Sequence, residues 1–318
     1  MITARGLVRT FATRTGAVEA VRGVDLHVDA GEIVGFLGPN GAGKTTTLRM
    51  LTTLLRPTAG TATVAGRDLL QDPVGVRRRI GYVAQGGTSL PQARAGEEIV
   101  DQARLYGIGR VDAVARGRDL FDRLDLDGLW DRSCASLSGG QRRRLDIALG
   151  LVHAPQLVFL DEPTTGLDPQ SRANLWEHVR TLRGNGATVF LTTHYLDEAD
   201  ALCDRILVMD HGRIVASGTP LELKRQVSGD AVALTLQDVD RAPDAATLAG
   251  ALSGADRPSV DGTLVVVHVP DGSSTLPGLL RDLDAKGIEL AGVEVRRPTL
   301  DDVFLTVTGR SLRDEPAA

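Results

Sequence analysis

The chain reads Ile33-Val34-Gly35-Phe36-Leu37-Gly38-Pro39-Asn40-Gly41-Ala42-Gly43-Lys44-Thr45 at the point that decides its fold. Residues 33–37 are almost continuously apolar, as a strand is when both of its faces are buried in a parallel sheet. Residues 38–45 match the pattern G-x-x-x-x-G-K-[ST], and a helix is expected directly after them, over residues 46–55. In this order of strand, turn and helix, the N–H groups of the turn converge on phosphate oxygens at the positive end of the helix. The stretch therefore predicts a phosphate-binding loop.

Two side chains of this loop carry the expected chemistry. Lys44 is expected to reach the β- and γ-phosphates of a nucleotide, and the Thr45 hydroxyl is expected to ligate Mg²⁺. A glycine-rich turn that matches the pattern by chance is the alternative, and the flanking strand and helix argue against it. The loop residues predicted to bind the nucleotide are Gly38, Pro39, Asn40, Gly41, Ala42, Gly43, Lys44, Thr45 and Thr46.

A second apolar strand ends in two adjacent carboxylates. Residues 157–160 are all apolar, and Asp161 and Glu162 follow them directly. Open parallel sheets bind their ligands at the carboxyl ends of the strands. Asp161 suits a Mg²⁺ partner, and Glu162 is placed to polarise an attacking water as a general base. An ordinary strand terminus is the alternative for this pair alone, but the phosphate-binding loop favours the catalytic interpretation.

The alternation of strands and helices predicts an α/β fold with a mainly parallel sheet, the fold of a P-loop NTPase domain. Between about residues 89 and 151 the pattern is helical only, which indicates a helical subdomain inserted into that domain. The whole domain is expected over residues 1–227. Its further elements are a half-buried strand at 24–28, buried strands at 157–160, 188–192 and 205–209, and helices at 170–183 and 197–202.

A small α+β accessory or regulatory domain is expected over residues 228–318, after a linker at Ser228-Gly229-Asp230. Its apolar pattern gives a βαββαβ order, which is compatible with a ferredoxin-like fold. Leu300, Val303 and Phe304 would share one face of its last helix. That face either closes the core of this domain or docks on the first domain or a partner subunit.

Composition restricts the classes of function. The 318 residues include 36 Lys and Arg against 41 Asp and Glu, for a net charge of −5. Nucleic acid is therefore not expected as a partner, because proteins that coat it are usually basic. Cys134 and Cys203 are too few for a disulfide framework and are expected to be small buried hydrophobic residues. The absence of an 18-residue apolar run and of an apolar signal-peptide core predicts a cytosolic protein.

The discriminating motif is Leu137-Ser138-Gly139-Gly140-Gln141. A serine and two glycines before a helix make a second anion-binding helix N-terminus, and one chain with two such turns needs a reason. This pentapeptide is the signature of the ATP-binding subunits of ABC transporters, which the sequence resembles. In that family the signature of one subunit completes the nucleotide site of the other in a head-to-tail dimer. The resemblance thus implies that Ser138, Gly139, Gly140 and Gln141 bind a nucleotide held by a second copy.

Further motifs of this family follow along the chain. Gln85 matches the glutamine of the Q-loop, a ligand of Mg²⁺ and water, and Asp168 matches the D-loop, which crosses the dimer interface. His194 matches the switch histidine that contacts the γ-phosphate. Phe11 lies where the family places an aromatic side chain that stacks on adenine, with a place in the core as the alternative. The resemblance implies that the catalytic residues are Lys44, Gln85, Glu162 and His194 and that the Mg²⁺ ligands are Thr45, Gln85 and Asp161.

Within the family, the wording resembles the drug-exporter subunits of the daunorubicin-resistance type, in residues 38–47, 54–60 and 192–199 and in the tail 298–310. The resemblance implies an ATPase that binds ATP and Mg²⁺, forms a homodimer and drives export of a hydrophobic drug or antibiotic. It also implies a separate transmembrane permease subunit as partner and a peripheral, cytoplasmic position on the inner face of the cell membrane. Export of another cargo, such as polysaccharide or lipid, and drug sequestration without transport remain the alternatives.

Two segments need separate interpretations. The runs Arg77-Arg78-Arg79 and Arg142-Arg143-Arg144 are expected to be solvated faces, with an acidic partner surface as the alternative. Residues 86–98 lack the acidic, threonine-containing run that is usual in the family. Because this region lies near the membrane-subunit contact in the family, the departure concerns the partner and the cargo rather than the ATPase.

Overall fold

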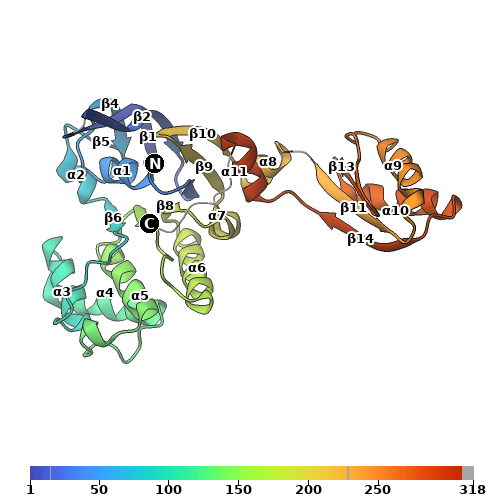
Figure 1. Cartoon of the computed structure of the whole chain (residues 1–318). Helices are drawn as coiled ribbons and strands as arrows, with labels where there is room; N and C mark the ends of the chain where they lie inside the picture. The colour runs from blue at the N-terminus through green and yellow to red at the C-terminus, as the bar shows by residue number, and fades with distance from the viewer. Residues whose placement is uncertain (15, 228, 310–318) are drawn as a thin grey trace. The chain divides into compact units, whose positions relative to one another are not determined.

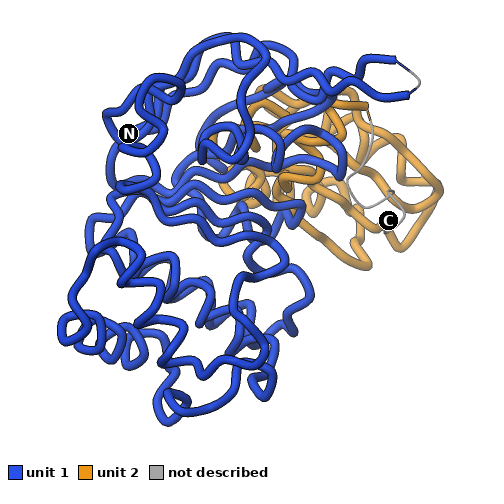
Figure 2. The backbone as a smooth tube through the Cα atoms, turned by 90° about the vertical axis from the view of Figure 1, so that its left-hand side faces the viewer, with its two compact units in different colours: residues 1–220, 315–318 blue, residues 221–314 orange. Residues whose placement is uncertain are grey.

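The computed structural model of the chain describes residues 1–14, 16–227 and 229–309. These residues form two compact units, residues 1–220 and residues from 221 onward (Figure 2). The predicted boundary at 227/228 lies after helix α8 (Pro220–Arg225), whereas the division of the structure lies at the start of that helix. Ser228 of the predicted linker and Arg310 of the tail motif lie outside the described residues. Asp230, predicted as linker, is instead the first residue of strand β11.

The first unit is built on a six-stranded sheet with the strand order β10-β9-β3-β8-β7-β6. Its strands are β3 (Ile33–Leu37), β6 (Ile80–Val83), β7 (Leu157–Asp161), β8 (Thr188–Thr193), β9 (Arg205–Asp210) and β10 (Arg213–Gly218). All neighbours except β10 and β9 pair in parallel. Every residue of β3, β7 and β8 is buried, which confirms the prediction of parallel strands covered on both faces.

A second, antiparallel sheet has the strand order β2-β1-β4-β5. Its strands are β1 (Ile2–Thr13), β2 (Gly16–Val28), β4 (Ala59–Val64) and β5 (Arg67–Asp68). Residues 24–28 alternate between buried and exposed positions, as predicted. Strand β1 was not predicted from the sequence, and its pairing with β2 shifts register at three places.

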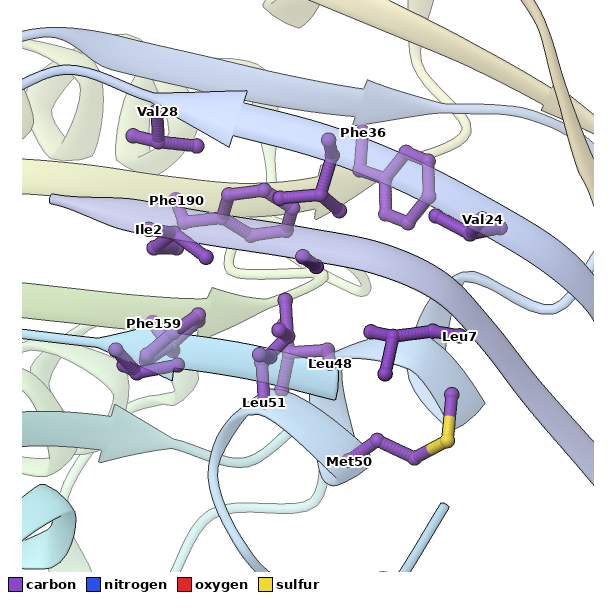
Figure 3. Packing of buried hydrophobic residues seen from close by; sticks show 14 of the residues in the cluster. Ile2, Leu7, Val24, Val28, Phe36, Leu48, Met50, Leu51, Phe159 and Phe190 are labelled. Atoms are coloured by element: carbon purple, nitrogen blue, oxygen red, sulfur yellow. The ribbon is translucent and has the colours of Figure 1, made fainter. Parts of the chain in front are cut away.

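The two sheets and helix α1 (Lys44–Leu51) share one hydrophobic core, which Figure 3 shows from close by. The ring of Phe190 lies 5.7 Å from that of Phe36 and 5.6 Å from that of Phe159. Leu48 and Leu51 of α1 are fully buried in the same cluster. Because aromatic and leucine side chains dominate core energetics, this packing fixes the helix that follows the phosphate-binding loop.

The other helices lie close to the predicted ones, and the helical subdomain is the group of α3, α4 and α5 (Figure 1). Helix α1 ends four residues before the predicted 55, because Thr53 has a positive φ of 65° that stops the helix. The remaining bounds in this unit are α2 (Pro73–Arg77), α3 (Ala95–Leu105), α4 (Arg110–Arg123), α5 (Gly139–Leu151), α6 (Pro169–Gly184) and α7 (Leu196–Leu202).

One prediction for α5 is wrong. Arg143, expected on a solvated face, is only 7% exposed, whereas Arg142 beside it is exposed. The reason is tertiary: the guanidinium of Arg143 donates hydrogen bonds to three backbone carbonyls of other segments of the chain. Such bonds satisfy the polar hydrogens that water would otherwise satisfy.

The second unit carries a four-stranded antiparallel sheet with the order β12-β13-β11-β14. Its elements are β11 (Asp230–Leu236), α9 (Ala242–Gly250), β12 (Ser259–Asp261), β13 (Leu264–Val269), α10 (Gly272–Ala285) and β14 (Leu290–Arg296). This βαββαβ order confirms the predicted topology. Apolar residues of β11, β13, α9 and α10 form its core.

The last described helix is α11 (Leu300–Thr308). Leu300, Val303 and Phe304 are buried on one face of it, as the spacing predicts, yet they are not part of the core cluster beneath the sheet of this unit. Cys134 and Cys203 are buried free thiols, as predicted. Among the described residues, no helix combines the length and the apolar composition that crossing a membrane requires.

Candidate functional site

Four neighbouring strands bring the predicted site residues to one edge of the parallel sheet. Strands β3, β8, β7 and β6 lie side by side and run in the same direction, so their carboxyl ends meet at that edge. The loops that leave these strands begin with Gly38, His194, Glu162 and Ala84–Gln85 in that order. Segments distant in sequence thus converge where such sheets bind ligands.

The phosphate-binding loop is shaped by close backbone approaches. Gly43 has a φ of +106°, and a Cβ there would lie 2.4 Å from the carbonyl oxygen of Ala20. Only glycine therefore fits this position at the start of α1. Lys44 is 4% exposed, and its ammonium Nζ donates to the carbonyl oxygens of Gly38 and Pro39 at 2.6 and 2.9 Å. The charge is thus held inside the loop that the sequence predicts to bind phosphate.

Asp161 and Thr45 are in direct contact across the site. The Thr45 hydroxyl donates to Oδ1 of Asp161 at 3.0 Å, and the Thr192 hydroxyl donates to the same oxygen at 2.7 Å. Asp161 is 1% exposed, so these hydroxyls supply hydrogen bonds that water does not. The hydroxyl and the carboxylate predicted to share a metal ion therefore do lie together.

Glu162 is the centre of a cluster of polar side chains. Gln85 donates from Nε2 to Oε2 of Glu162 at 2.8 Å, and the Thr165 hydroxyl donates to the same oxygen at 3.2 Å. Nδ1 of His194 lies 3.3 Å from Oε2, and Nζ of Lys44 lies 3.9 Å from Oε1. The other three residues predicted to be catalytic, Lys44, Gln85 and His194, are thus within contact distance of the Glu162 carboxylate.

The surroundings of Glu162 keep its carboxyl ionised. His194 beside it is the largest cause that lowers the pKa of Glu162 below 4.5; burial opposes this effect, while Lys44 and Thr165 add to it. At neutral pH the group is a carboxylate, the form that a general base requires.

The backbone at Glu162 is also unusual. Its φ of +43° lies in the left-handed region, which non-glycine residues rarely adopt. The Glu162 N–H donates hydrogen bonds to both the hydroxyl and the backbone carbonyl of Thr192, at 3.0 and 3.1 Å. Strained backbone of this kind persists where surrounding contacts enforce it, commonly at functional sites.

The signature turn forms the start of α5 and is exposed. Ser138 caps the helix, since its hydroxyl accepts the Gln141 N–H at 3.3 Å while its own N–H donates to Oε1 of Gln141 at 3.0 Å. A Cβ on Gly140 would lie 2.9 Å from the hydroxyl of Ser171 on α6. Ser138 and Gly139 are exposed to solvent. Among the described residues, no hydrogen bond or ion pair joins this turn to Glu162.

Two other predicted residues lie apart from Glu162. Asp168 caps α6, accepting the N–H and the hydroxyl of Ser171 at 2.9 and 2.6 Å, and these bonds hold the pKa of its carboxyl below 3.8. Phe11 is half-buried in β1, with the guanidinium of Arg9 at 4.6 Å from its ring centroid. Phe11 is not in the core cluster of this unit, and its role beside an adenine stays a prediction.

Thr165, Thr192 and Arg143 were not predicted from the sequence as part of the site. Thr192 was readable in principle, because its hydroxyl stands at the carboxyl end of a buried strand, two residues before His194. Thr165 follows the two carboxylates at a short distance along the chain. Arg143 carried no such signal, since it stands within a run of three arginines.

Known families match both units. A model described as ABC transporter matches residues 21–165, and one described as ATP-binding protein DrrA1-3-like, C-terminal domain, matches residues 218–308. The daunorubicin resistance ATP-binding protein DrrA3 of Streptomyces coeruleorubidus is 44% identical over 96% of each chain. The daunorubicin/doxorubicin resistance ATP-binding protein DrrA of Streptomyces peucetius is 43% identical over 97% of this chain and 92% of its own. The Nod factor export ATP-binding protein I of Burkholderia lata is 38% identical over 96% of this chain and 97% of its own.

Solved structures agree with the first unit. An ATP binding subunit of an ABC transporter superposes with a TM-score of 0.63 at 27% identity, over 71% of this chain and 92% of that chain. The protein cbiO1 from Clostridium perfringens, part of the ABC transporter complex cbiONQ, gives a TM-score of 0.63 at 27% identity, over 70% of this chain and 89% of its own. Since the curated relatives match nearly the whole length, the chain belongs to the ABC transporter ATP-binding proteins of the daunorubicin-resistance type, and its first unit is an ATPase domain of that family.

Proposed function

We propose that this subunit hydrolyses Mg²⁺-bound ATP at a site shared by two copies of the chain, and that hydrolysis drives export of a hydrophobic drug through a separate membrane subunit. The cluster around Glu162 is the observation that supports the hydrolytic part, because it joins a buried carboxylate to Lys44, Gln85 and His194. The drug-resistance relatives support the cargo.

The residues present fit a magnesium ion. The Thr45 hydroxyl and the Asp161 carboxylate are already in contact, at 3.0 Å, and Gln85 adds an amide. Hydroxyl, carboxylate and amide oxygens are the hard ligands that Mg²⁺ prefers, and it commonly takes only one or two carboxylates together with phosphate oxygens. Thr45, Gln85 and Asp161 would therefore hold the ion. When bound, it would neutralise charge on the β- and γ-phosphates.

The chain's own residues would divide the chemistry as follows. Lys44 binds the β- and γ-phosphates as a fixed positive charge. Glu162 accepts a proton from the attacking water at its carboxylate, and Gln85 and Thr165 hold that carboxylate in position. His194 contacts the same oxygen, so it is placed to orient both the carboxylate and the γ-phosphate. Positioning and charge account for catalysis of this kind, and no covalent intermediate is required.

The second copy would supply the signature. Among the described residues, the side-chain hydrogen bonds of the turn Ser138–Gln141 stay within the turn, and Ser138 and Gly139 are exposed to solvent. A helix N-terminus is a favourable place for an anion, and α5 is 13 residues long. These observations support a dimer in which Ser138, Gly139, Gly140 and Gln141 approach the γ-phosphate bound by the other chain.

Ser138→Arg should prevent that dimer, because a long cationic side chain would occupy the place of the partner's phosphate. The measurement is the molar mass in ATP and Mg²⁺, in a chain that also carries Glu162→Gln so that nucleotide is retained. Loss of the helix cap costs about 1 kcal/mol, so the melting temperature is recorded as well. Ser274→Arg, at an exposed position of α10, is the control for added bulk. A folded Ser138→Arg chain that dimerises like its parent would remove the signature from the interface.

Export is tested in cells that carry this chain together with the separate membrane subunit proposed as its partner. If the proposal holds, the pair lowers accumulation of daunorubicin, whereas a pair with Lys44→Ala does not. Equal accumulation of daunorubicin in the two kinds of cell would show that this drug is not the cargo, and it would not bear on the proposed ATP hydrolysis. A relative named for Nod factor export supports another cargo as the alternative, but no contact among the described residues favours it.

The second unit is proposed as an accessory or regulatory domain over residues 228–318. Its βαββαβ sheet and separate core support a module of its own. The match of residues 218–308 to a C-terminal domain of this branch supports the same assignment.

A further inference from the structure

Arg143 is a buried cation bonded entirely to backbone. It lies on the inner side of α5 and is 7% exposed. Its Nε donates to the carbonyl oxygen of Pro163 at 2.8 Å, its Nη1 to that of Ala84 at 2.6 Å and its Nη2 to that of Asp161 at 3.0 Å. Among the described residues, it forms no ion pair with a carboxylate.

The three carbonyls that Arg143 contacts belong to residues next to Gln85 and Glu162. Ala84 directly precedes Gln85, and Asp161 and Pro163 are the two residues on either side of Glu162. One guanidinium therefore fixes the backbone next to both polar residues that meet at 2.8 Å in the site. A planar, rigid donor set such as that of arginine suits three acceptors in fixed directions.

A second residue of the same helix holds the other side of the Q-loop. Asp146, one helical turn after Arg143, is 3% exposed, and its Oδ1 accepts the N–H groups of Thr88 and Ser89 at 3.0 and 3.3 Å. A Cβ on Gly87 would lie 2.7 Å from Oδ2 of Asp146. Residues 84–89 are thus held to α5 from both ends, and Gln85 lies between the two points of attachment.

Burial of the charged Arg143 guanidinium carries a desolvation cost that its hydrogen bonds must offset. Desolvation lowers the pKa of the Arg143 guanidinium, partly offset by the charges of Asp146 and Asp161. A buried charge without a paired carboxylate is stable only while its hydrogen bonds are complete. Arg143 therefore requires the Q-loop and the residues around Glu162 to remain in this one arrangement.

We propose that Arg143, assisted by Asp146, is a positioning residue that holds Gln85 and Glu162 at their working distance and ties both to the helix that begins at Ser138. The proposal rests on the proposed function, since it assumes that Glu162 and Gln85 act on the attacking water. Arg143 is not expected to contribute to nucleotide binding, because among the described residues it makes no hydrogen bond to the loop at residues 38–46.

A positioning role and a merely structural role of Arg143 are distinguished by comparing kcat with nucleotide affinity. Loss of positioning lowers kcat and leaves the Kd for nucleotide unchanged. Arg143→Met keeps most of the side-chain length and apolar volume but removes all donors. Displacement of catalytic groups by about 1 Å lowers rates roughly 10²-fold. Arg143→Met should therefore lower kcat by about 10- to 100-fold while KM and the Kd for a fluorescent ATP analogue stay within about threefold of the parent. Arg143→Lys, which keeps the charge and part of the donor set, should recover part of kcat. Arg142→Met, on the exposed side of the same helix, is the matched control.

The full-length variants are compared by melting temperature, analogue Kd and steady-state ATP hydrolysis. A folded Arg143→Met with normal Kd and lowered kcat supports the proposal, whereas a folded one with kcat within about threefold of the parent overturns it. If Arg143→Met does not fold, Arg143→Lys decides: reduced kcat at normal Kd supports positioning, and unchanged kcat overturns it. Failure of the parent itself to hydrolyse ATP would instead count against the proposed function, so the two failures are distinguishable.

Discussion

Substituting Lys44 by alanine is expected to abolish ATP turnover and leave the fold intact. Lys44→Ala removes the ammonium that two loop carbonyls hold in place, and with it the positive charge that would stabilise the β- and γ-phosphates. Loss of one preorganised donor of this kind costs at least roughly 10²-fold in kcat. Phosphate release at saturating ATP and Mg²⁺ is the measurement.

Only three lysines occur in the chain, so the control is simple to choose. Lys286 is exposed at the end of α10 in the other unit, and Lys286→Ala should hydrolyse ATP like the parent. A folded Lys44→Ala chain whose turnover stays within about threefold of the parent, roughly 0.7 kcal/mol in the barrier, would show that the phosphate-binding loop is misassigned.

Glu162→Gln is expected to bind ATP normally and to hydrolyse it roughly 10²- to 10⁴-fold more slowly, the usual contribution of a general base. The substitution keeps the size of the side chain and the hydrogen bonds that an amide oxygen can accept from Gln85 and Thr165. It removes the carboxylate whose pKa is kept low by His194. A single-turnover measurement with prebound ATP reports the chemical step directly.

The matched control for Glu162→Gln is Glu177→Gln, an exposed carboxylate on α6 that pairs with Arg180. This control should hydrolyse ATP at the parental rate. A Glu162→Gln chain with an unchanged single-turnover rate would mean that another group accepts the proton, and the role assigned to the cluster around Glu162 would then be wrong.

Much of the site was predictable because its chemistry lies at the ends of apolar strands. Residues 33–37 and 157–160 read as buried parallel strands, and the side chains that follow such strands must meet at one edge. The contact between Thr45 and Asp161 and the contacts of Glu162 with Lys44 follow from that geometry. The order of elements in the second unit followed in the same way from strand and helix periodicity.

Other features depend on tertiary contacts that no local pattern encodes. Arg143 looks like one member of a solvated run, and its burial is decided by carbonyls 20 and 59 residues away in sequence. Strand β1 was missed because its burial alternates only over its first residues and its register then shifts. The positive φ of Glu162 is likewise imposed by its neighbours, Thr192 among them, and has no signature in the residue type.

In the proposed dimer, two copies of the chain complete each nucleotide site. The most direct test is the molar mass of Glu162→Gln by light scattering after gel filtration in ATP and Mg²⁺. A shared site predicts a mass twice the 33.7 kDa of one chain with ATP, and a return to 33.7 kDa when ATP is omitted or Ser138→Arg is added. A mass of 33.7 kDa for the Glu162→Gln chain with ATP bound would contradict the shared site.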